Sequence, residues 1–493
     1  MDRICLITPP SPFLLDERVF IHLGILKVAS SLELAGYGVD FLDLSGVTNY
    51  LDVVEAYLES NEDISVYGIT ATTPQVPNAV KVCKIIKRYN KKVILGGPHV
   101  TLMHTASKRE MKRGLEKGRR ACDDVQSLKE VFDVLVCGDG ELSIFEALET
   151  DSGIVDADDR KSKYFLSHQQ FTDLPFPARH LVDIESYNYS IEGERATSLI
   201  AQLGCPFRCS FCSGRNSPFL RKIRLRSSES VMKEIDLLYK TYGLKGFMFY
   251  DDELNVNKNM VELMNMITDY QDKNDIEFKL RGFVKAELFN ELQAKAMYRA
   301  GFRWLLTGFE SGDERILKNI RKIATKQDNT RAVEIAKKNN LKVKALMSIG
   351  HAGENYQSIE NTKNWLLDVQ PEDFDCTVIT TYPGSPYFDD AILNGDHYVY
   401  EDSITKDKLY QANINYLEDL DFYKGDPDGG YVSYVWTDHL SPKELIEERS
   451  KLESEVREKL KIPFNPGRPG IKYEHSMGMG NIIIPDHILR RNG

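Results

Sequence analysis

Three cysteines stand within eight residues, in the order Cys205-Pro-Phe-Arg-Cys209-Ser-Phe-Cys212. Three thiolates at this C-x3-C-x2-C spacing can hold three corners of an iron–sulfur cube. A closed zinc site needs four ligands, and the nearest further histidines are His180 and His351. The spacing therefore favours a [4Fe–4S] cluster whose fourth iron is open to another ligand. A zinc site completed from a distant part of the chain and three unliganded thiols are the alternatives.

The cysteines follow an apolar segment that reads as a strand, and five further strand–helix units come after them. The predicted strands are Ser198–Gly204, Gly246–Asp252, Phe278–Phe283, Trp304–Ser311, Lys342–Gly350 and Asp373–Tyr382. Six parallel strands are too few for a closed eight-stranded barrel, so we expect a partial (β/α)6 barrel. Barrel chemistry takes place at the carboxyl ends of the strands.

Polar and glycine residues stand at those strand ends. They are Asp251, Asp252, Arg281, Glu310, Ser311 and Gly350. A lone acidic residue at a strand end is as readily a helix N-cap or a partner in a loop salt bridge. The ordered series along consecutive strands favours a shared site.

The first 150 residues alternate short apolar runs with amphipathic helical patterns. The predicted strands are Arg3–Thr8, Gly38–Leu42, Ser65–Thr70, Lys92–Gly96 and Val134–Cys137. This alternation predicts a parallel sheet covered on both faces, as in Rossmann-like α/β domains. Ligands of such sheets bind outside the carboxyl ends of the strands.

The loops at those ends are rich in glycine, proline and hydroxyl residues. They contain Pro10, Thr70, Thr72, Thr73, Gly96, Gly97, Pro98, His99, Gly138, Gly140 and Glu141. Such loops let a large ligand approach the backbone and offer neutral hydrogen bonds. The dinucleotide fingerprint G-x-G-x-x-G does not follow the first strand. The alternative is that these residues are only suitable turn formers.

The cysteine loop, with Phe211 just before its third cysteine, resembles the signature of the radical S-adenosylmethionine superfamily. The resemblance implies that Cys205, Cys209 and Cys212 hold the cluster and that Phe211 contacts the adenine of S-adenosylmethionine. It further implies roles for the strand-end residues. Asp251 and Asp252 would contact the methionyl amino group, Glu310 and Ser311 the methionyl or ribose part, Gly350 the adenine, and Arg281 a carboxylate or substrate anion.

A Rossmann-like unit before such a barrel is similar to the cobalamin-binding subfamily. The segments Gly-Gly-Pro-His-Val-Thr and Cys-Gly-Asp-Gly-Glu and the connector Leu174-Pro-Phe-Pro carry this resemblance, which spans roughly residues 1–390. It implies that the eleven loop residues above bind cobalamin. The D-x-H-x-x-G motif of a histidine-ligated cobalamin is missing because Asp16 and His22 have another spacing. That spacing argues against a histidine axial ligand, for which His22 and His99 are the remaining candidates.

The subfamily resemblance implies methyl transfer to an unactivated carbon or a phosphinate phosphorus, through methylcobalamin and a 5′-deoxyadenosyl radical. The alternatives are a radical rearrangement, cyclisation or oxidation with the same cofactors, and a non-catalytic iron–sulfur protein. A ferredoxin or flavodoxin would supply electrons. A small metabolite, a tetrapyrrole and a protein side chain all stay open as substrates.

We expect four units along the chain. These are a cobalamin domain (1–150), a linker (151–195), the barrel (196–390) and a mainly helical C-terminal substrate or capping domain (391–493) that includes a charged helix, Glu444–Lys461. The basic stretch His104–Lys129 is either a solvated helix or a docking surface for an acidic partner.

Composition limits the remaining possibilities. The net charge is −11 over 493 residues, which argues against a nucleic-acid partner. No run of eighteen apolar residues predicts a membrane span, and the first residues read as a strand rather than a signal peptide. We therefore expect a cytoplasmic protein whose eight cysteines are thiols or metal ligands.

Overall fold

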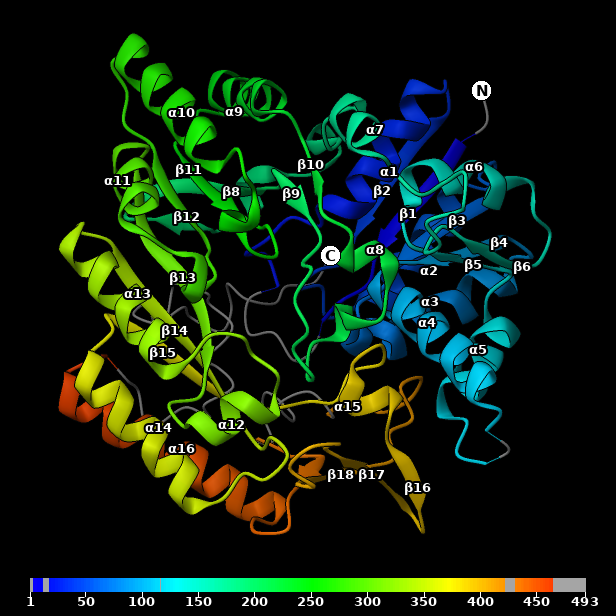
Figure 1. Cartoon of the computed structure of the whole chain (residues 1–493). Helices are drawn as coiled ribbons and strands as arrows, with labels where there is room; N and C mark the ends of the chain where they lie inside the picture. The colour runs from blue at the N-terminus through cyan, green and yellow to red at the C-terminus, as the bar shows by residue number, and fades with distance from the viewer. Residues whose placement is uncertain (1–2, 12–16, 116, 422–430, 464–493) are drawn as a thin grey trace.

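Two sheets of parallel strands lie beside each other, and a small antiparallel sheet lies below their junction (Figure 1). The computed structural model describes residues 3–11, 17–115, 117–421 and 431–463. Helices long and apolar enough to cross a bilayer are absent from these ranges. The expected class, a Rossmann-like unit followed by a partial barrel, is confirmed.

The first sheet has six parallel strands in the order β2-β1-β3-β4-β5-β6. All five predicted strands are present, and the sequence reading missed β6, whose four residues carry little periodic signal. The strands are β1 (Arg3–Thr8), β2 (Gly38–Asp43), β3 (Val66–Thr70), β4 (Lys92–Gly96), β5 (Val134–Cys137) and β6 (Gly153–Asp156).

Helices cover both faces of this sheet because alternate strand residues point to opposite sides. Ile4 and Leu6 of β1 pack under α1 and α6, whereas Cys5 and Ile7 pack under the helices of the other face. The helices are α1 (Leu23–Leu34), α2 (Tyr50–Ser60), α3 (Val76–Arg88), α4 (Pro98–Arg113), α5 (Arg120–Val131) and α6 (Gly140–Glu149).

The second sheet has the order β15-β14-β13-β12-β11-β8-β7, with the six predicted strands parallel and β7 (Ser190–Ile191) antiparallel at one edge. The parallel strands are β8 (Glu194–Leu199), β11 (Gly246–Phe249), β12 (Lys279–Phe283), β13 (Phe302–Glu310), β14 (Lys342–Ile349) and β15 (Asp373–Val378). The outer helices are α9 (Ser228–Tyr242), α10 (Met260–Asn274), α11 (Glu291–Arg299), α12 (Glu314–Asn319), α13 (Lys326–Lys338) and α14 (Tyr356–Val369).

The first barrel strand ends earlier than the sequence predicts. β8 stops at Leu199, and the next residues form β9 (Gln202–Leu203), which pairs antiparallel with β10 (Arg224–Leu225). The cause is Asp251, whose carboxylate accepts hydrogen bonds from the backbone N–H groups of Ala201 and Gln202. These bonds draw the chain out of the sheet, so that β9 and β10 bracket the cysteine loop.

The C-terminal unit is not mainly helical in its described part. It is a four-stranded antiparallel sheet of β16 (Ile392–Asn394), β17 (His397–Glu401), β18 (Lys408–Ala412) and β19 (Val435–Trp436), followed by one helix, α16 (Pro442–Leu460). The tyrosine-rich segment forms strands because aromatic residues suit a half-buried pleated surface. Tyr398 and Tyr400, two residues apart, are both buried on one face of β17. Residues 464–493 lie outside the described part of this unit.

The basic stretch between β4 and β5 folds into α4 and α5 and contacts α15 (Pro386–Asp389) at the end of the barrel unit. It also contacts the C-terminal unit, where the Arg120 guanidinium lies 4.0 Å from the Tyr398 ring centroid. The Arg109 side chain lies 3.1 Å from a carboxylate oxygen of Asp389 and 3.0 Å from one of Asp390. The Arg120 guanidinium stacks on Phe388 at 3.6 Å from the ring centroid. Part of the predicted docking surface is therefore occupied within the molecule.

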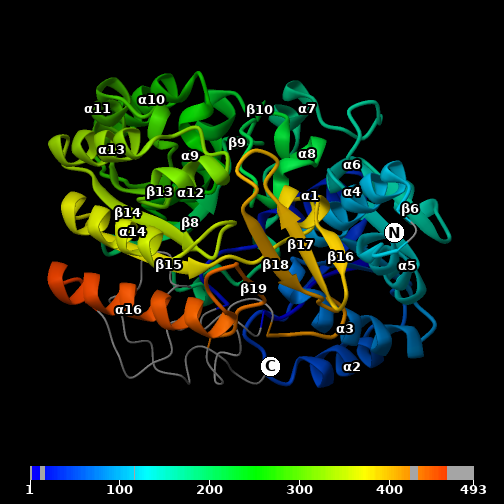
Figure 2. The ribbon, with the colours of Figure 1, turned by 60° about the horizontal axis from the view of Figure 1, so that its bottom comes forward.

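Helix α16 covers the open edge of the barrel at β15, beside α14 (Figure 2). Arg449 Nε donates a hydrogen bond of 2.7 Å to the carbonyl of Cys376, and a Glu453 oxygen accepts one of 3.2 Å from the Cys376 N–H. Unpaired edge groups otherwise invite pairing with another chain. Side chains of a helix thus take the place of a further strand.

Replacing Arg449 by alanine should remove this hydrogen bond and leave buried polar groups without a partner. We expect the unfolding free energy to fall by about 2–4 kcal/mol, seen as a thermal midpoint lower by roughly 5–10 °C in scanning calorimetry. Lys451, which is exposed on the same helix, provides the control: Lys451→Ala should leave the midpoint unchanged. Equal midpoints for both variants would contradict the edge-covering role.

Candidate functional site

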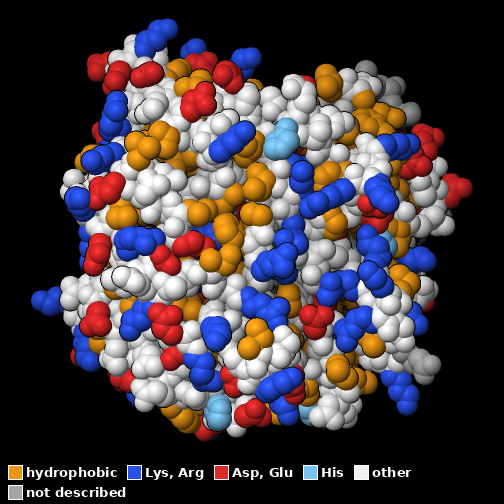
Figure 3. Space-filling view, viewed as in Figure 1, with side chains coloured by type: hydrophobic (Ala, Val, Ile, Leu, Met, Phe, Trp, Pro, Cys, Tyr) orange, Lys and Arg blue, Asp and Glu red, His pale blue; other side chains and the backbone are white. Residues whose placement is uncertain are grey.

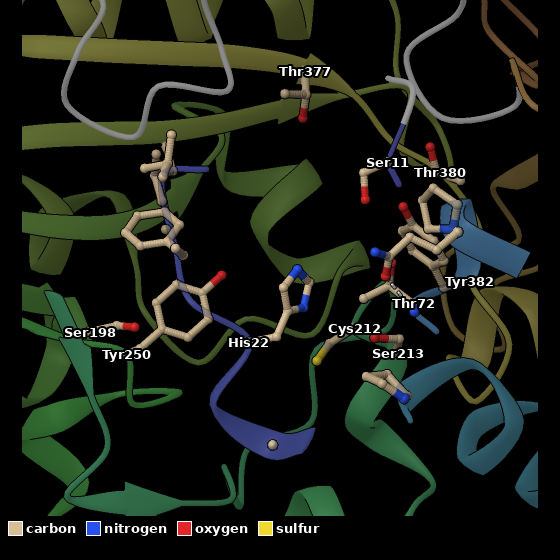
Figure 4. A pocket seen from close by; sticks show the side chains of 18 of the residues that line it. Ser11, His22, Thr72, Ser198, Cys212, Ser213, Tyr250, Thr377, Thr380 and Tyr382 are labelled. Atoms are coloured by element: carbon tan, nitrogen blue, oxygen red, sulfur yellow. Dashed lines mark hydrogen bonds between the residues drawn. The ribbon is translucent and has the colours of Figure 1, made fainter. Parts of the chain in front are cut away.

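A cavity of about 910 Å³ lies between the carboxyl ends of the two parallel sheets (Figure 4). From the first sheet it is lined by Thr70 and Thr72, and from the barrel by Glu310, Met347 and Thr377. Phe211, Cys212 and Ser213 form another part of its wall. Both ligand-binding faces therefore open onto one space, although they are far apart in the sequence.

A second cavity, of about 230 Å³, adjoins the first at the carboxyl ends of β1, β3, β4 and β5. Seven of the predicted cobalamin residues line it: Thr70, Gly96, Gly97, Pro98, Gly138, Gly140 and Glu141. Thr70, Pro98, Gly24 and Ile25 line both cavities. The two cavities are therefore parts of one continuous site.

Glycine is required at two positions of this second cavity. Gly97 has φ +102°, and a Cβ there would lie 2.7 Å from Thr70 Oγ1. Gly138 has φ +86°, and its Cβ would lie 2.6 Å from the backbone nitrogen of Asp158. Such conformations are accessible to glycine and strained for other residues. They bring the bare backbone to the cavity, which suits a large flat ligand.

The cysteine loop is held in a frame of backbone and carboxylate hydrogen bonds. Cys205 N donates to Leu220 O at 2.9 Å, and Gly204 N donates to Asp252 Oδ2 at 2.7 Å. Cys212 lines the large cavity, as does His22 (Figure 4). The frame places the third cysteine of the loop at the cavity.

The three thiols influence one another electrostatically. Cys212 is exposed at the cavity, and desolvation together with the neighbouring Cys209 and Cys205 raises its pKa to about 12. No three His, Cys, Asp or Glu residues in the described ranges converge on a single-ion site. A [4Fe–4S] cluster accounts for thiols that do not converge on one point, since each thiolate would bind a different iron atom. The donor set therefore fits a cluster better than a zinc ion.

Glu310 lies at the cavity, as the strand-end pattern predicts. Its Oε1 is 3.3 Å from Lys322 Nζ, and its Oε2 accepts a hydrogen bond of 2.9 Å from Ser348 Oγ. Ser348 Oγ also lies 2.8 Å from His351 Nε2, and the His351 ring is 5.4 Å from that of Phe211. A polar chain thus connects the fourth-strand carboxylate to the aromatic residue of the cysteine loop.

A second group of charges lies near the cysteines, and the sequence pattern shows only one of its members, Glu253, at a strand end. Burial raises the pKa of Glu253 to about 7, against the lowering effect of Lys322 and Lys285. The same two lysines lower the pKa of Cys209, against the larger effect of burial. Glu253 directly follows the predicted Asp251–Asp252 pair, whereas the separated positions of the lysines gave no signal. Ammonium groups at this position favour a thiolate.

Two family models match the chain in succession. The B12 binding domain matches residues 17–119, and the radical SAM superfamily matches residues 199–366. Together they cover more than half of the chain. The chain belongs to the cobalamin-binding radical S-adenosylmethionine enzymes. Its cofactors are a [4Fe–4S] cluster, S-adenosylmethionine and cobalamin.

Individual relatives differ in what they are named for. An uncharacterised methyltransferase of Pyrococcus horikoshii is 29% identical over 80% of this chain and 83% of its own length. An anaerobic magnesium-protoporphyrin IX monomethyl ester cyclase of Rubrivivax gelatinosus is 26% identical over 74% of this chain and 65% of its own. Among solved structures, the methyltransferase TsrM from Kitasatospora setae, with cobalamin and a [4Fe–4S] cluster bound, has a similar fold, with a TM-score of 0.57 at 17% sequence identity. The match covers 78% of this chain and 77% of the TsrM chain.

Asp251 and Asp252 of this radical SAM enzyme hydrogen-bond to the backbone around the start of the cysteine loop. Asp251 binds the backbone of Ala201 and Gln202, and Asp252 binds that of Gly204. Burial raises the pKa of Asp251 to about 8. Both carboxylates therefore support the loop that leads to the cysteines, which the strand-end position alone did not distinguish from ligand binding.

Three further predicted S-adenosylmethionine residues are outside the walls of both cavities. Arg281 lies inside the barrel with its guanidinium 5.8 Å from the Trp304 ring centroid. Ser311 Oγ is 3.1 Å from Thr362 Oγ1 of α14. A Cβ on Gly350 would meet the Val378 side chain at 3.2 Å. The sequence pattern places each residue near a strand end, but none of the three lines either cavity.

Three predicted cobalamin residues also turn away from the cavities. His99 Nε2 lies 3.3 Å from Asp124 Oδ2 of α5. Pro10 accepts a hydrogen bond of 3.1 Å at its carbonyl oxygen from Asn78, and Thr73 is buried at the start of a short 3-10 helix. Their neighbours in sequence, Thr72 and Pro98, do line the large cavity.

His22 takes the opposite position to His99. It precedes α1, lines the large cavity and points into it (Figure 4). Burial lowers its pKa, so its imidazole is neutral at physiological pH. Asp16, the other residue of the altered axial-ligand spacing, lies outside the described residues. The structure thus separates the two candidate histidines and keeps only His22 beside the site.

Replacing Cys212 by alanine should prevent cluster assembly, because only two of the three cysteine ligands of the cluster would remain. Anaerobically reconstituted protein should contain less than about one third of the wild-type iron and sulfide, with loss of the broad visible absorbance. Cys122 lies outside the motif on α5, and Cys122→Ala should keep wild-type iron. Full iron in the Cys212 variant would refute the assignment of the cluster to this loop.

Asp251 makes stability depend on pH in a defined direction. Its pKa is about 8 when folded and 3.8 ordinarily, so between these values the folded chain holds a proton that the unfolded chain releases. Raising the pH from about 5 to about 8 should therefore destabilise the fold, by up to about 1.4 kcal/mol per unit. Asp251→Asn keeps the acceptor oxygen but cannot titrate. The thermal midpoint of this variant should fall less than that of the wild type over this pH range. Equal decreases in the two proteins would contradict the raised pKa of Asp251.

Proposed function

We propose that this enzyme transfers a methyl group from S-adenosylmethionine, by way of cobalamin, to an unactivated carbon of its substrate. The observation that carries the proposal is the continuous cavity, which joins the glycine-lined face of the first sheet to Cys212 and Glu310. When bound, the cluster would supply the electron that cleaves S-adenosylmethionine to a 5′-deoxyadenosyl radical, and cobalamin would carry the methyl group.

In this proposal the chain's own residues position the reactants. Cys205, Cys209 and Cys212 hold the cluster, and Phe211 with Glu310 lies where the adenosyl and methionyl parts would bind. The loops at Thr70, Gly96–Pro98 and Gly138–Glu141 hold the corrin, with Thr72 at the junction. Bringing the reactants together in one enclosed space accounts for a large part of such rate enhancements.

The space left for a substrate lies on the barrel side. Thr377 at the end of β15, with Ile379 and Thr380 just after it, lines this wall. Tyr250 and Phe20 line the same cavity. Their hydroxyl and aromatic groups suit a largely apolar molecule with a few polar groups. An acidic low-potential carrier such as a ferredoxin or flavodoxin would supply the electrons.

A second candidate reaction uses the same cofactors without methyl transfer. The cyclase from Rubrivivax gelatinosus, whose sequence aligns with three quarters of this chain, supports it. A radical cyclisation or oxidation would consume S-adenosylmethionine only by reductive cleavage. The two candidates therefore differ in their by-products.

Incubation of the reconstituted enzyme with S-adenosyl-[methyl-d3]methionine, a reductant and a small-molecule extract of the source cells should distinguish them. Methyl transfer predicts both S-adenosylhomocysteine and 5′-deoxyadenosine, with a new compound heavier by the labelled methyl group in mass spectrometry. Enzyme carrying Cys212→Ala serves as the control and should form neither nucleoside product. Deoxyadenosine without homocysteine would contradict methyl transfer and favour the second candidate.

A further inference from the structure

Four arginines gather around the outer side of the cysteine loop. Arg208 belongs to the loop itself, Arg215 and Arg221 follow it, and Arg160 comes from the segment after β6. Arg221 Nη2 donates a hydrogen bond of 3.1 Å to the carbonyl of Pro206, inside the motif. We call these four residues the basic patch. Lysine and arginine side chains are seen over this part of the face, near α8 (Pro218–Arg221) and β10 (Figure 3).

The patch is a concentration of like charge in an acidic protein. Burial lowers the pKa of Arg215 and of Arg221, and neighbouring arginines lower it further: Arg221 and Arg208 act on Arg215, and Arg208 and Arg160 act on Arg221. No ion pair joins any of the four to a carboxylate within the described residues. Like charges held together without counter-charges repel one another.

Two guanidinium groups of the patch also have unused hydrogen-bonding atoms. Arg215 Nη1 and Arg221 Nε are buried, and neither has a hydrogen-bond partner among the described residues. Buried donors are normally satisfied. Arg208 and Arg160, in contrast, are exposed. The charge that the patch presents to an anionic partner therefore comes mainly from the exposed Arg160 and Arg208.

The location of the patch indicates which partner it serves. Arg208 lies between Cys205 and Cys209, and Arg215 N donates to the carbonyl of Cys212. A protein that docks here would lie beside the loop that carries the three cysteines. We infer that the basic patch is the docking surface for an acidic one-electron carrier protein that reduces the cluster. The inference depends on the cluster and not on the reaction that follows.

Electrostatic docking of this kind has a measurable signature. Complementary charge raises the association rate, and salt screens the effect. Reversing two exposed charges, Arg160→Glu with Arg208→Glu, should reduce the rate of cluster reduction by an acidic flavodoxin at least about tenfold at low salt. Calorimetric binding of the same flavodoxin to the reconstituted enzyme should weaken to a similar degree.

The matched control reverses two exposed arginines elsewhere, Arg88 on α3 and Arg331 on α13, whose side chains are 67% and 48% exposed. This variant carries the same net charge and should bind and accept electrons as the wild type does. Reduced methyl viologen, a small cation, should reduce all three proteins at rates within about twofold, because it needs no docking site.

Two results would overturn the inference. One is a patch variant that reacts with flavodoxin as fast as the control variant does. The other is an equal loss with flavodoxin and with viologen, which would place the defect in the cluster or its ligands. If Arg208→Glu impairs cluster assembly, Arg160→Glu alone, outside the motif, should still slow the flavodoxin reaction and spare that of viologen. Failure of methyl transfer itself leaves both rate measurements unaffected.

Discussion

The structure depends on how the segment after the cysteines is tied to the first sheet. Arg224 of β10 forms a buried ion pair with Asp139, with Nη1 and Oδ1 2.6 Å apart, in the loop that also carries Gly138 and Gly140. Asp158, just after β6, accepts hydrogen bonds from Ser217 Oγ at 2.9 Å and from Phe219 N at 2.6 Å. Breaking a buried charge pair is strongly unfavourable. These carboxylates therefore fix the distance between the corrin site and the cluster loop.

That constraint explains why one chain can bring two cofactor sites into a shared cavity. Phe219, which follows the cysteine loop, lines the smaller cavity, while Cys212 lines the larger. The end of the barrel unit holds the same arrangement from another side, where Asp389 of α15 accepts a hydrogen bond from Asn216 and lies beside Arg109 of α4. Three separate carboxylates thus hold the residues after the cysteines from two sides.

The open barrel leaves room for this arrangement, but it also leaves one edge strand without a partner strand. A closed barrel has no edges, whereas a six-stranded parallel sheet leaves β15 unpaired on one side. Helix α16 covers this edge, because its Arg449 and Glu453 side chains hydrogen-bond to the backbone of Cys376 in β15. The opening is then left for the first sheet and its ligand rather than for another strand.

Local signals were sufficient for the elements and for the cluster. Period-2 and period-3.6 patterns predicted eleven of the parallel strands, and the C-x3-C-x2-C spacing identified the cysteines, because both depend on residues close together in the chain. The same reasoning located seven cobalamin residues at one cavity. It failed for the C-terminal unit, where tyrosine-rich β-strands were taken for parts of a helical domain.

Contacts between distant residues could not be read from the chain. A strand-end position does not reveal a side chain's direction, so Asp251, Ser311 and His99 were assigned to ligands although they support neighbouring loops and helices. Lys322 and Lys285 were missed because no motif relates them to Cys209. Residue types and spacing set which cofactors the chain can hold. Long-range packing and buried charge pairs set where those cofactors meet, since such contacts join residues separated by tens to hundreds of positions.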